Sequence, residues 1–593
     1  MLRSLLLSFI LIFSLSGCKN DSGEKQNSEI SQSFNKMLND YYEDGLVLNP
    51  INATLMGDNR YNDQLPNDIT VSHREKLKNY YSGYNEKLSQ FKKEELNSVD
   101  QVSYDLLAWE CNINLEDLQF PSHLMPIAQI NSFPLFFGQL ASGSAAQPFK
   151  TVKDYENWLK RLNAFTEWCD TAIANMKTGM NSGYVLPKAL TVKIIGQMTS
   201  LSKGPVEKHL YYSPVGLIPK TFTPEETKKI TADYHAMVEN QIIPEFKKLA
   251  VFLEKEYLPK SRISTGINEI PNGEAYYAHR VKMFTTTNMT ADEIFKIGEK
   301  EVARISAEME KVKAEVGFKG DLKSFFAELR TKKELTHYTD PKQVLDHFEK
   351  IHETMIPNLE KLFGKKPKSK FEIRQTEAFR AASSSAEYNQ GSIDGTRPGI
   401  FYVPIPDVKK YNILSDESLF LHEAIPGHHY QVSLQQEDTT LPKFRKILWY
   451  SAYGEGWALY TESLGKELGL YTDPYQYFGM LSAEMHRAIR LVADAGMHSK
   501  NWTREQAIQY SLDHEARTEE GIVSEIERYM AMPGQALSYK IGQLKIRELR
   551  TKAEQELGNK FDIREYHNKV LETGCVPIQL LEDRINFWIA SKK

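Results

Sequence analysis

The sequence predicts a mostly α-helical protein in which two helical lobes enclose a cleft and a small β-sheet lies near the functional site. Helix-capping patterns recur along the 593 residues, whereas runs of β-forming residues are few. The clearest strands are expected at about 371–377 and 398–403, and the second precedes a histidine cluster at 422–429. A chain of this length buries one large core or two domains.

The N-terminal residues predict export and lipid attachment. Residues 1–17 resemble a signal peptide, with Arg3 before a short apolar run and small residues before Cys18. We expect cleavage before Cys18, its lipidation, and anchoring to a membrane outside the cytoplasm, facing the periplasm or the cell surface. The alternative is a secreted protein with an incidental cysteine. Residues 18–30 are polar and are expected to form a flexible tether.

Capping residues mark the expected helix starts. Thr223 is followed by Pro224 at the first helical position and by Glu226, which completes a capping box. Similar starts lie at Thr290, Ser415 and Thr503. The helix expected after Ser415 carries the histidine cluster.

That cluster, His422 to His429, contains a His-Glu pair and two further histidines. In many zinc hydrolases, two histidines four residues apart on one helix bind the metal, and the Glu between them is the general base. Here the fourth residue after His422 is Pro426, which interrupts a regular helix. His429 lies two turns from His422, roughly 10 Å along a helix axis, so a regular helix cannot bring both to one zinc ion.

The usual spacing is restored if Ile425 and Pro426 form a bulge, because His-Glu-Ala-Gly-His then remains. In this interpretation His422 and His428 bind one Zn²⁺ ion and Glu423 is the general base. His429 then supports a ligand or contacts substrate, or it replaces His428 as ligand. A structural Pro-Gly turn with paired histidines is the alternative without a metal.

Catalytic zinc needs a third protein ligand, and Glu455 is the best candidate. It lies among apolar and aromatic residues between two glycines, and a buried carboxylate needs a cationic partner. Glu462, seven residues further on, is placed to orient a ligand histidine. The alternative is that Glu455 is an ordinary surface carboxylate.

These motifs resemble a known family. The strings 422–431 (His-Glu-Ala-Ile-Pro-Gly-His-His-Tyr-Gln) and 454–460 (Gly-Glu-Gly-Trp-Ala-Leu-Tyr), together with 394–403 and 533–542, resemble the family catalogued as domain of unknown function 885. Its members are bacterial proteins, many of them described as lipoproteins, and they are grouped with gluzincin-type zinc metallopeptidases. The resemblance covers nearly the whole chain after the signal peptide and implies a metallopeptidase with one zinc ion.

A more distant similarity is to the thermostable carboxypeptidase Taq family. Its regular His-Glu-x-Gly-His motif is followed by a glutamate ligand, which Glu455 fits, and by a Tyr-x-Leu-Gly segment, which resembles 539–542. The inserted Ile425-Pro426 departs from that pattern. It leaves the choice between His428 and His429 open, although Gly427-His428 matches the family's Gly-His pair.

Further residues are candidates for catalysis and substrate binding. Tyr539 is expected to donate a hydrogen bond to the oxyanion of the intermediate, and a buried structural tyrosine is the alternative. Arg397 and Arg528 are candidates for a substrate carboxylate. The helical stripe of His486, Arg490, Asp494 and His498 faces the cleft or pairs with itself on a solvated face, and Arg490 and Asp494 form a plausible ion pair.

The strand that contains Tyr402 resembles the edge strand that holds an extended peptide beside the metal in gluzincin-like enzymes. A buried structural strand is the alternative. Tyr402 is therefore a candidate substrate-binding residue.

We therefore expect an N-terminal helical region at 31–275 that forms one cleft wall, and a catalytic zinc region at 276–593. A single interlocked fold is the alternative. The expected activity is that of a zinc metallopeptidase, similar to a carboxypeptidase or dipeptidase, acting on a peptide or small amide. The alternatives are a zinc amidase or esterase, and a lipid-anchored binding protein without activity.

The charge and the cysteine content argue against a nucleic-acid partner and against a metal site made of cysteines. The net charge is −5 and no basic block is evident, so nucleic acid is not expected as a partner. Cys111, Cys169 and Cys575 lack metal-binding spacing and are expected to be buried thiols rather than zinc ligands, and at most one disulfide could form among them.

Overall fold

The computed structural model describes residues 20–130, 132–142, 146–377, 381, 385–393, 395 and 397–593, with side chains described from Glu29 onward. The predicted mostly helical fold with a small sheet is confirmed. The signal peptide and Cys18 lie outside the described residues. The arrangement of two lobes around a cleft stays a prediction.

The first half of the chain is helical. Its α-helices are α1 (Asn20–Leu48), α2 (Pro50–Leu55), α3 (Val71–Leu88), α4 (Ser98–Asp117), α5 (Phe133–Leu140), α6 (Val152–Ser182), α7 (Lys188–Leu201), α8 (Pro224–Met237), α9 (Ile243–Phe252) and α10 (Gly273–Thr285). Residues 20–30, for which we expected a tether, lie within α1. This segment contains Glu, Lys and Gln, which favour helix, and it lacks proline.

The second half adds the sheet and the remaining helices. The helices are α11 (Ala291–Glu315), α12 (Leu322–Thr331), α13 (Pro341–Leu362), α14 (Asp416–Glu423), α15 (His428–Glu437), α16 (Lys443–Ile447), α17 (Ser451–Glu462), α18 (Pro474–Ser499), α19 (Arg504–His514), α20 (Glu519–Ala531), α21 (Ser538–Leu557), α22 (Ile563–Leu571) and α23 (Ile578–Lys592). The strands are β1 (Phe371–Gln375), β2 (Glu387–Asn389) and β3 (Gly399–Val403).

The predicted helix starts are largely confirmed. Thr223, Thr290 and Thr503 each complete a capping box at the start of α8, α11 and α19. Ser415 occupies the N-cap position of α14, but its side chain does not cap the helix. Its hydroxyl instead donates a hydrogen bond to the carbonyl oxygen of Gly479, at 3.3 Å.

The sheet has the strand order β1-β3-β2. β3 pairs in parallel with β1 on one side and antiparallel with β2 on the other. Of the two alternatives for residues 398–403, the buried structural strand is confirmed and the edge strand is excluded, because β3 is central and every residue in it is buried. The three-residue strand β2, which sequence patterns did not reveal, forms an edge instead.

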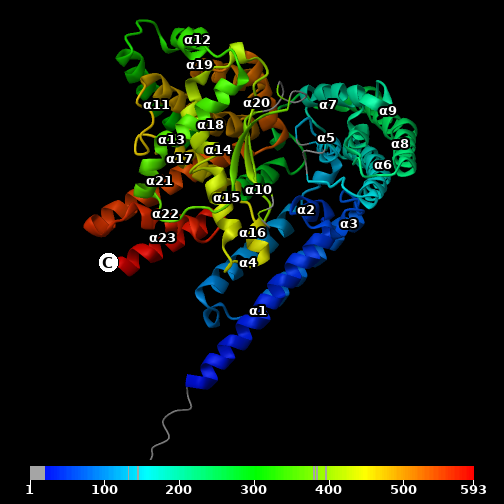
Figure 1. Cartoon of the computed structure of the whole chain (residues 1–593), viewed down its shortest axis with the longest axis horizontal. Helices are drawn as coiled ribbons and strands as arrows, with labels where there is room; N and C mark the ends of the chain where they lie inside the picture. Colours follow the sequence, from blue (N-terminus) through cyan, green and yellow to red (C-terminus); the bar gives the residue numbers. More distant parts are fainter. Residues whose placement is uncertain are drawn as a thin grey trace, which may run out of the picture.

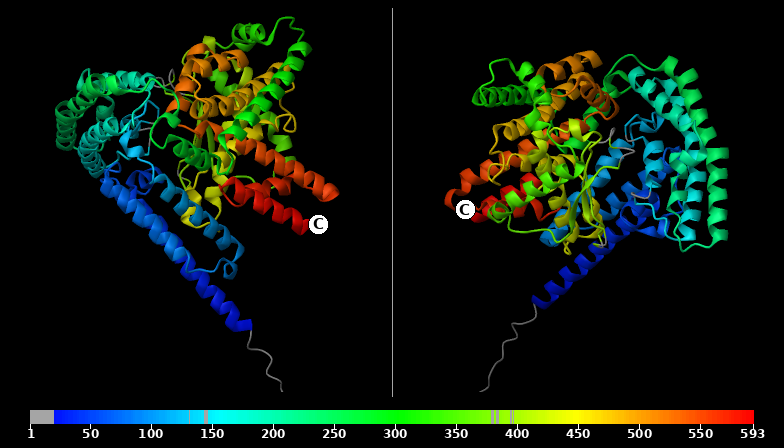
Figure 2. Two further views of the ribbon diagram at one scale, coloured as in Figure 1. Left: turned by 180° about the vertical axis from the view of Figure 1, so that it is seen from behind. Right: turned by 45° about the horizontal axis from the view of Figure 1, so that its top comes forward.

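Two large hydrophobic cores organise the molecule. One core lies within residues 51–257 and includes Trp158, Phe165 and Phe246. The other joins α1, α3 and α4 to the helices of the second half. Figures 1 and 2 show α6, α7, α8 and α9 gathered on one side, while the long helix α1 runs beneath the second half. The predicted boundary at residue 275 stays a prediction.

Two further expectations concern cysteines and membranes. Cys111, Cys169 and Cys575 are buried free thiols, as predicted. Among the described residues, no helix combines the length and the apolar character that a membrane span requires.

Glycines allow α17 and α21 to approach closely, and α17 carries Glu455. A Cβ on Gly456 would lie 2.6 Å from the backbone of Gly542, and a Cβ on Gly542 would overlap the carbonyl oxygen of Ala452. Backbone atoms cannot rotate away as a flexible side chain can. The two helices therefore require glycine at their crossing.

We expect Gly542→Ala to lower the free energy of unfolding by about 1–3 kcal/mol, because the added methyl group must push the two helices apart. Thermal and urea denaturation measure this change. Gly83→Ala is the matched control, because a Cβ at this position in α3 meets no atom within 4 Å and alanine favours helix. Equal stability of the two variants would show that the crossing tolerates a side chain.

Candidate metal centre

The histidine cluster lies at a break between two helices. α14 ends at Glu423, residues 424–427 form the connection with a cis Ile425–Pro426 peptide bond, and α15 begins at His428. The prediction of one helix with a two-residue bulge is therefore wrong. The close turn requires Gly427, whose Cβ would overlap the carbonyl oxygen of His422.

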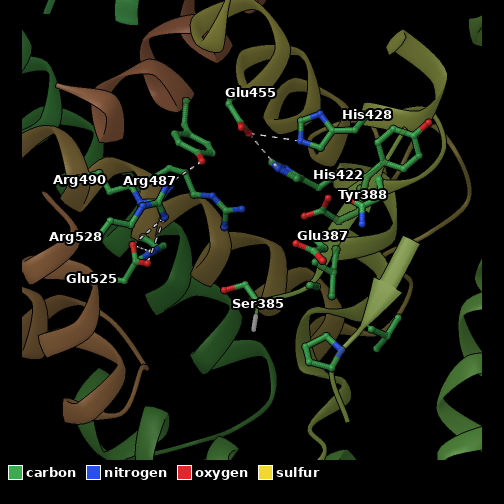
Figure 3. A pocket seen from close by; sticks show the side chains of 18 of the residues that line it. Ser385, Glu387, Tyr388, His422, His428, Glu455, Arg487, Arg490, Glu525 and Arg528 are labelled. Carbon is green, nitrogen blue, oxygen red and sulfur yellow. Dashed lines mark hydrogen bonds and ion pairs between the residues drawn. The ribbon is translucent and has the colours of Figure 1, made fainter. Parts of the chain in front are cut away.

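This turn brings the rings of His422 and His428 together, with their centroids 4.8 Å apart. Glu455 on α17 points between them (Figure 3): its Oε2 atom lies 3.6 Å from His422 Nε2 and 3.5 Å from His428 Nε2. The three potential ligand atoms all lie within 4.8 Å of one another. The predicted ligand set thus converges from three helices that the sequence separates.

α17 supports both sides of the helix break. Glu462 Oε1 lies 2.7 Å from His422 Nδ1, and Thr461 donates a hydrogen bond to the carbonyl oxygen of Leu421 at 2.8 Å. Trp457 Nε1 donates to the carbonyl oxygen of Pro426 at 2.9 Å. When Nε2 gives up its proton, the proton on Nδ1 stays with Glu462 and the Nε2 lone pair faces Glu455, which is the tautomer that binds metal.

The electrostatics of the cluster favour a bound cation. Burial lowers the pKa of His422, but the carboxylates of Glu455 and Glu462 outweigh burial and raise the pKa to about 10. Burial raises the pKa of Glu455, yet His422 and His428 outweigh this effect and hold it well below its usual range. In the described part of the chain, no Lys or Arg lies within 4.0 Å of the Glu455 carboxylate.

These residues fit a tetrahedral zinc ion. Ligand atoms about 2.1 Å from such an ion are about 3.4 Å from one another. The two distances from Glu455 to the histidines are close to this value. Two imidazoles, one carboxylate and one remaining position are the donor set of catalytic zinc sites.

His429 points elsewhere. Its Nδ1 atom lies 3.1 Å from the hydroxyl of Tyr388 and 3.3 Å from that of Ser433, and its ring packs against Phe371. Burial lowers the pKa of His429 to about 4, which keeps it neutral. Of the two candidates that the sequence left open, His428 is the one beside Glu455.

The cluster lies in a cavity of about 870 Å³. His422, Glu423, His428, Glu455 and Tyr539 all line it. Burial raises the pKa of the Glu423 carboxyl group. The predicted base, ligands and oxyanion donor therefore share one cavity.

A group of arginines lies across this cavity from the histidines (Figure 3). Arg490 Nη2 contacts Glu525 at 2.8 Å, and its guanidinium lies 4.5 Å from the centre of the Tyr539 ring. Arg528 contacts Glu525 at 3.4 Å and donates to the Tyr539 hydroxyl at 3.3 Å. Arg487 and Arg517 also line the cavity, so this wall is strongly cationic.

Other predicted substrate residues do not reach the cavity. Arg397 is exposed, and Tyr402 is buried in β3 next to Val403, which does line it. His498 is fully buried: its Nδ1 accepts from the backbone N–H of Ile267, and its Nε2 contacts the carbonyl oxygen of Tyr529. Both ring nitrogens of His498 thus contact buried backbone groups, so His498 has a structural role.

The predicted polar stripe on α18 divides in two. His486 and Arg490 line the cavity, whereas Asp494 accepts hydrogen bonds from Tyr277 and from the backbone of Gly534. Arg490 pairs with Glu525 rather than with Asp494. The same face of α18 therefore lines the cavity at His486 and Arg490 and makes buried structural contacts at Asp494.

Sequence reasoning missed several residues of the cavity. Arg487 lies on α18, Arg517 in the loop before α20 and Glu525 on α20, and no spacing pattern links them. Glu387 and Tyr388 belong to the short strand β2, whose three residues give no periodic signal. Only the tertiary structure brings these segments to the same cavity.

Comparisons with known proteins agree with this fold. The family described as bacterial protein of unknown function (DUF885) matches residues 50–585. A solved structure described as "the putative lipoprotein from Colwellia psychrerythraea" is 26% identical with a TM-score of 0.87, and the match covers 95% of this chain and 100% of that one.

A second solved structure, "a putative lipoprotein of unknown function from Shewanella oneidensis", is 20% identical with a TM-score of 0.73. That match covers 93% of this chain and 99% of the other. No curated protein matches the chain.

We expect His428→Ala to abolish stoichiometric zinc binding and His429→Ala to retain it, because only His428 faces Glu455. Zinc content after dialysis, measured by elemental analysis together with circular dichroism to verify folding, separates the two variants. Loss of zinc in folded His429→Ala alone would reverse the assignment.

Proposed function

The chain belongs to the bacterial protein family of unknown function DUF885, and from this premise we propose that it is a zinc-dependent peptidase of the carboxypeptidase or dipeptidase kind. The observation that carries the proposal is the convergence of His422, His428 and Glu455 on the wall of one cavity. These residues would hold one Zn²⁺ ion, and Glu462 would orient His422. When bound, zinc supplies Lewis acidity, which makes a water molecule more acidic and polarises a carbonyl group.

Glu423 is the proposed general base. It directly follows His422 and lines the same cavity, so its carboxylate is close to any group that the two histidines and Glu455 hold. Burial raises its pKa above the usual range of a glutamate, which makes the carboxylate a stronger base. Glu423 would accept the proton of the attacking water and pass it to the leaving amine.

Tyr539 is the proposed oxyanion donor. Its hydroxyl oxygen accepts hydrogen bonds from Arg528 Nη2 at 3.3 Å and from Gln535 Nε2 at 3.4 Å. The proton of the phenol therefore remains available to a substrate oxygen. Arg490, over the ring, adds positive potential on the same side.

The arginine wall supports a substrate with a free carboxylate. Arg487, Arg490, Arg517 and Arg528 face the cavity, and the carboxylate of Glu525 contacts Arg490 and Arg528. Guanidinium groups bind carboxylates through paired hydrogen bonds. A peptide that extends from the histidines toward this wall would present its C-terminal carboxylate to the arginines.

The edge strand β2 supports an extended peptide conformation. Glu387 to Asn389 line the cavity, and in the described residues β2 pairs only with β3. The backbone of Tyr388 and Asn389 in this strand would offer hydrogen bonds to an extended substrate. This role replaces the one that the sequence suggested for β3.

We also propose that the protein is lipid-anchored at Cys18 in the bacterial cell envelope. The lipobox-like residues before Cys18 support this location, as does similarity to two structures described as lipoproteins. The membrane partner is then the bilayer that holds the anchor.

We expect Glu423→Gln to lower kcat for peptide cleavage by about 10²–10⁴, because the amide cannot accept the proton. The zinc content should stay at the level of the unchanged protein, since Glu423 is not a ligand. A peptide library read by mass spectrometry gives the cleaved bonds and the rates. Equal turnover by the variant would exclude Glu423 as base, and cleavage of esters but of no peptide would replace the peptidase with an esterase.

We expect Arg528→Gln to reduce the preference for a free C-terminal carboxylate over the amidated peptide by about tenfold to a hundredfold, because one charge-assisted hydrogen bond is lost. The ratio of kcat/KM for the paired peptides measures this preference. An indirect effect of the substitution on Tyr539 would change kcat/KM equally for both peptides, so it does not change the ratio. Arg397→Gln removes an exposed arginine outside the cavity and should leave the ratio unchanged. An unchanged ratio in Arg528→Gln would remove this arginine from carboxylate recognition.

A further inference from the structure

A second cavity, of about 690 Å³, shares no lining residue with the first. It lies between the start of α4, the end of α15, α16, and the C-terminal helices α22 and α23. Its basic lining residues are Lys365, Lys366, Lys368, Arg445 and Arg584. Its acidic lining residues are Glu437, Asp438 and Glu572.

Arg445 is a buried cation without a counter-ion. It is 2% exposed, and its guanidinium donates to the carbonyl oxygens of Val99 and Thr573 and to the hydroxyl of Ser103. All of these acceptors are neutral, and its Nε–H has no acceptor. Among the described residues, no carboxylate lies within 4.0 Å of the Arg445 guanidinium, although burying a charge without an opposite charge is costly.

Arg584 adds a second positive charge to the same cavity. Its Nε–H is buried and has no acceptor, and its ion pair with Glu572 is long, at 3.8 Å. Glu572 is shared with Lys569, at 2.9 Å. Burial and, to a smaller extent, the charge of Arg584 lower the pKa of Arg445 to about 10. The two positive charges therefore repel each other, and among the described residues no carboxylate lies within 4.0 Å of both guanidinium groups.

Two of the three acidic lining residues, Glu437 and Asp438, are hydrogen-bonded to neighbouring parts of the chain. Glu437 accepts hydrogen bonds from the backbone N–H groups of Lys368 and Ser369, at 2.7 Å each. Asp438 accepts from the backbone and side chain of Thr440. The Glu437 contacts hold the basic segment 365–368 beside the cavity, where its exposed lysines can turn toward a ligand.

We propose that this second cavity binds a small anion that carries a phosphate group. Phosphate suits the site because guanidinium groups form paired hydrogen bonds with its oxygens. The lysines add positive charge, and their flexible side chains can approach the phosphate from several directions. The cavity volume is that of a small-molecule site. The phosphate belongs either to a free solute or to a lipid headgroup at the membrane surface, and both sources present the same chemistry.

Calorimetric titration of the metal-free full-length chain with inorganic phosphate tests the proposal. We expect saturable binding that Lys368→Gln and Arg584→Gln each weaken about tenfold or more, because each variant loses a charged hydrogen-bond donor. Lys319→Gln, which removes an exposed lysine outside the cavity, is the matched control and should bind like the unchanged protein. Arg528→Gln, which changes the arginine wall of the first cavity, should leave phosphate affinity at this site unchanged, and this separates the two cavities.

Vesicles distinguish the two sources of phosphate. Co-sedimentation with phosphatidylglycerol vesicles, compared with phosphatidylcholine vesicles, should fall in Lys368→Gln and Arg584→Gln if the site takes a headgroup, and the N-terminal anchor contributes equally to every variant. Binding of free phosphate alone assigns a solute, and binding of anionic vesicles alone assigns a lipid. If neither form of binding differs between these variants and Lys319→Gln, the proposal is wrong.

Discussion

The carboxylate of Glu455, which lies between two imidazoles and has no Lys or Arg of the described residues within 4.0 Å, is the constraint on which the functional account depends. The glycines around it allow α17 to approach α21, and α17 in turn fixes the helix break through Trp457 and Thr461. The same packing therefore builds the fold and brings the ligand atoms together.

The cavity has two chemically different walls. The histidines, Glu423 and Glu455 form the wall that suits a metal and a water molecule, and the arginines form the wall that suits an anion. Tyr539 belongs to the arginine wall, because its ring packs against Arg490 and its hydroxyl accepts a hydrogen bond from Arg528. A substrate with a carbonyl group and a terminal carboxylate matches both walls.

The sequence predicted the mostly helical fold, because capping residues are local signals. It singled out His422 and Glu455 but left the choice between His428 and His429 open, because the motif spacing is irregular. It did not predict the break between α14 and α15, since propensity cannot distinguish a bulge from a new helix start after proline. β2, Arg517 and Glu525 also escaped prediction, because only tertiary packing brings them to the cavity. His498 was misjudged since a polar residue on a helix can satisfy buried backbone groups as readily as it can face a cleft.

The most direct test of the central claim is X-ray anomalous diffraction at the zinc edge from crystals of the zinc-loaded protein. The account predicts one peak about 2.1 Å from Nε2 of His422, Nε2 of His428 and a carboxylate oxygen of Glu455. A peak beside His429 instead of His428, or full zinc occupancy at a site away from Glu455, would contradict the account.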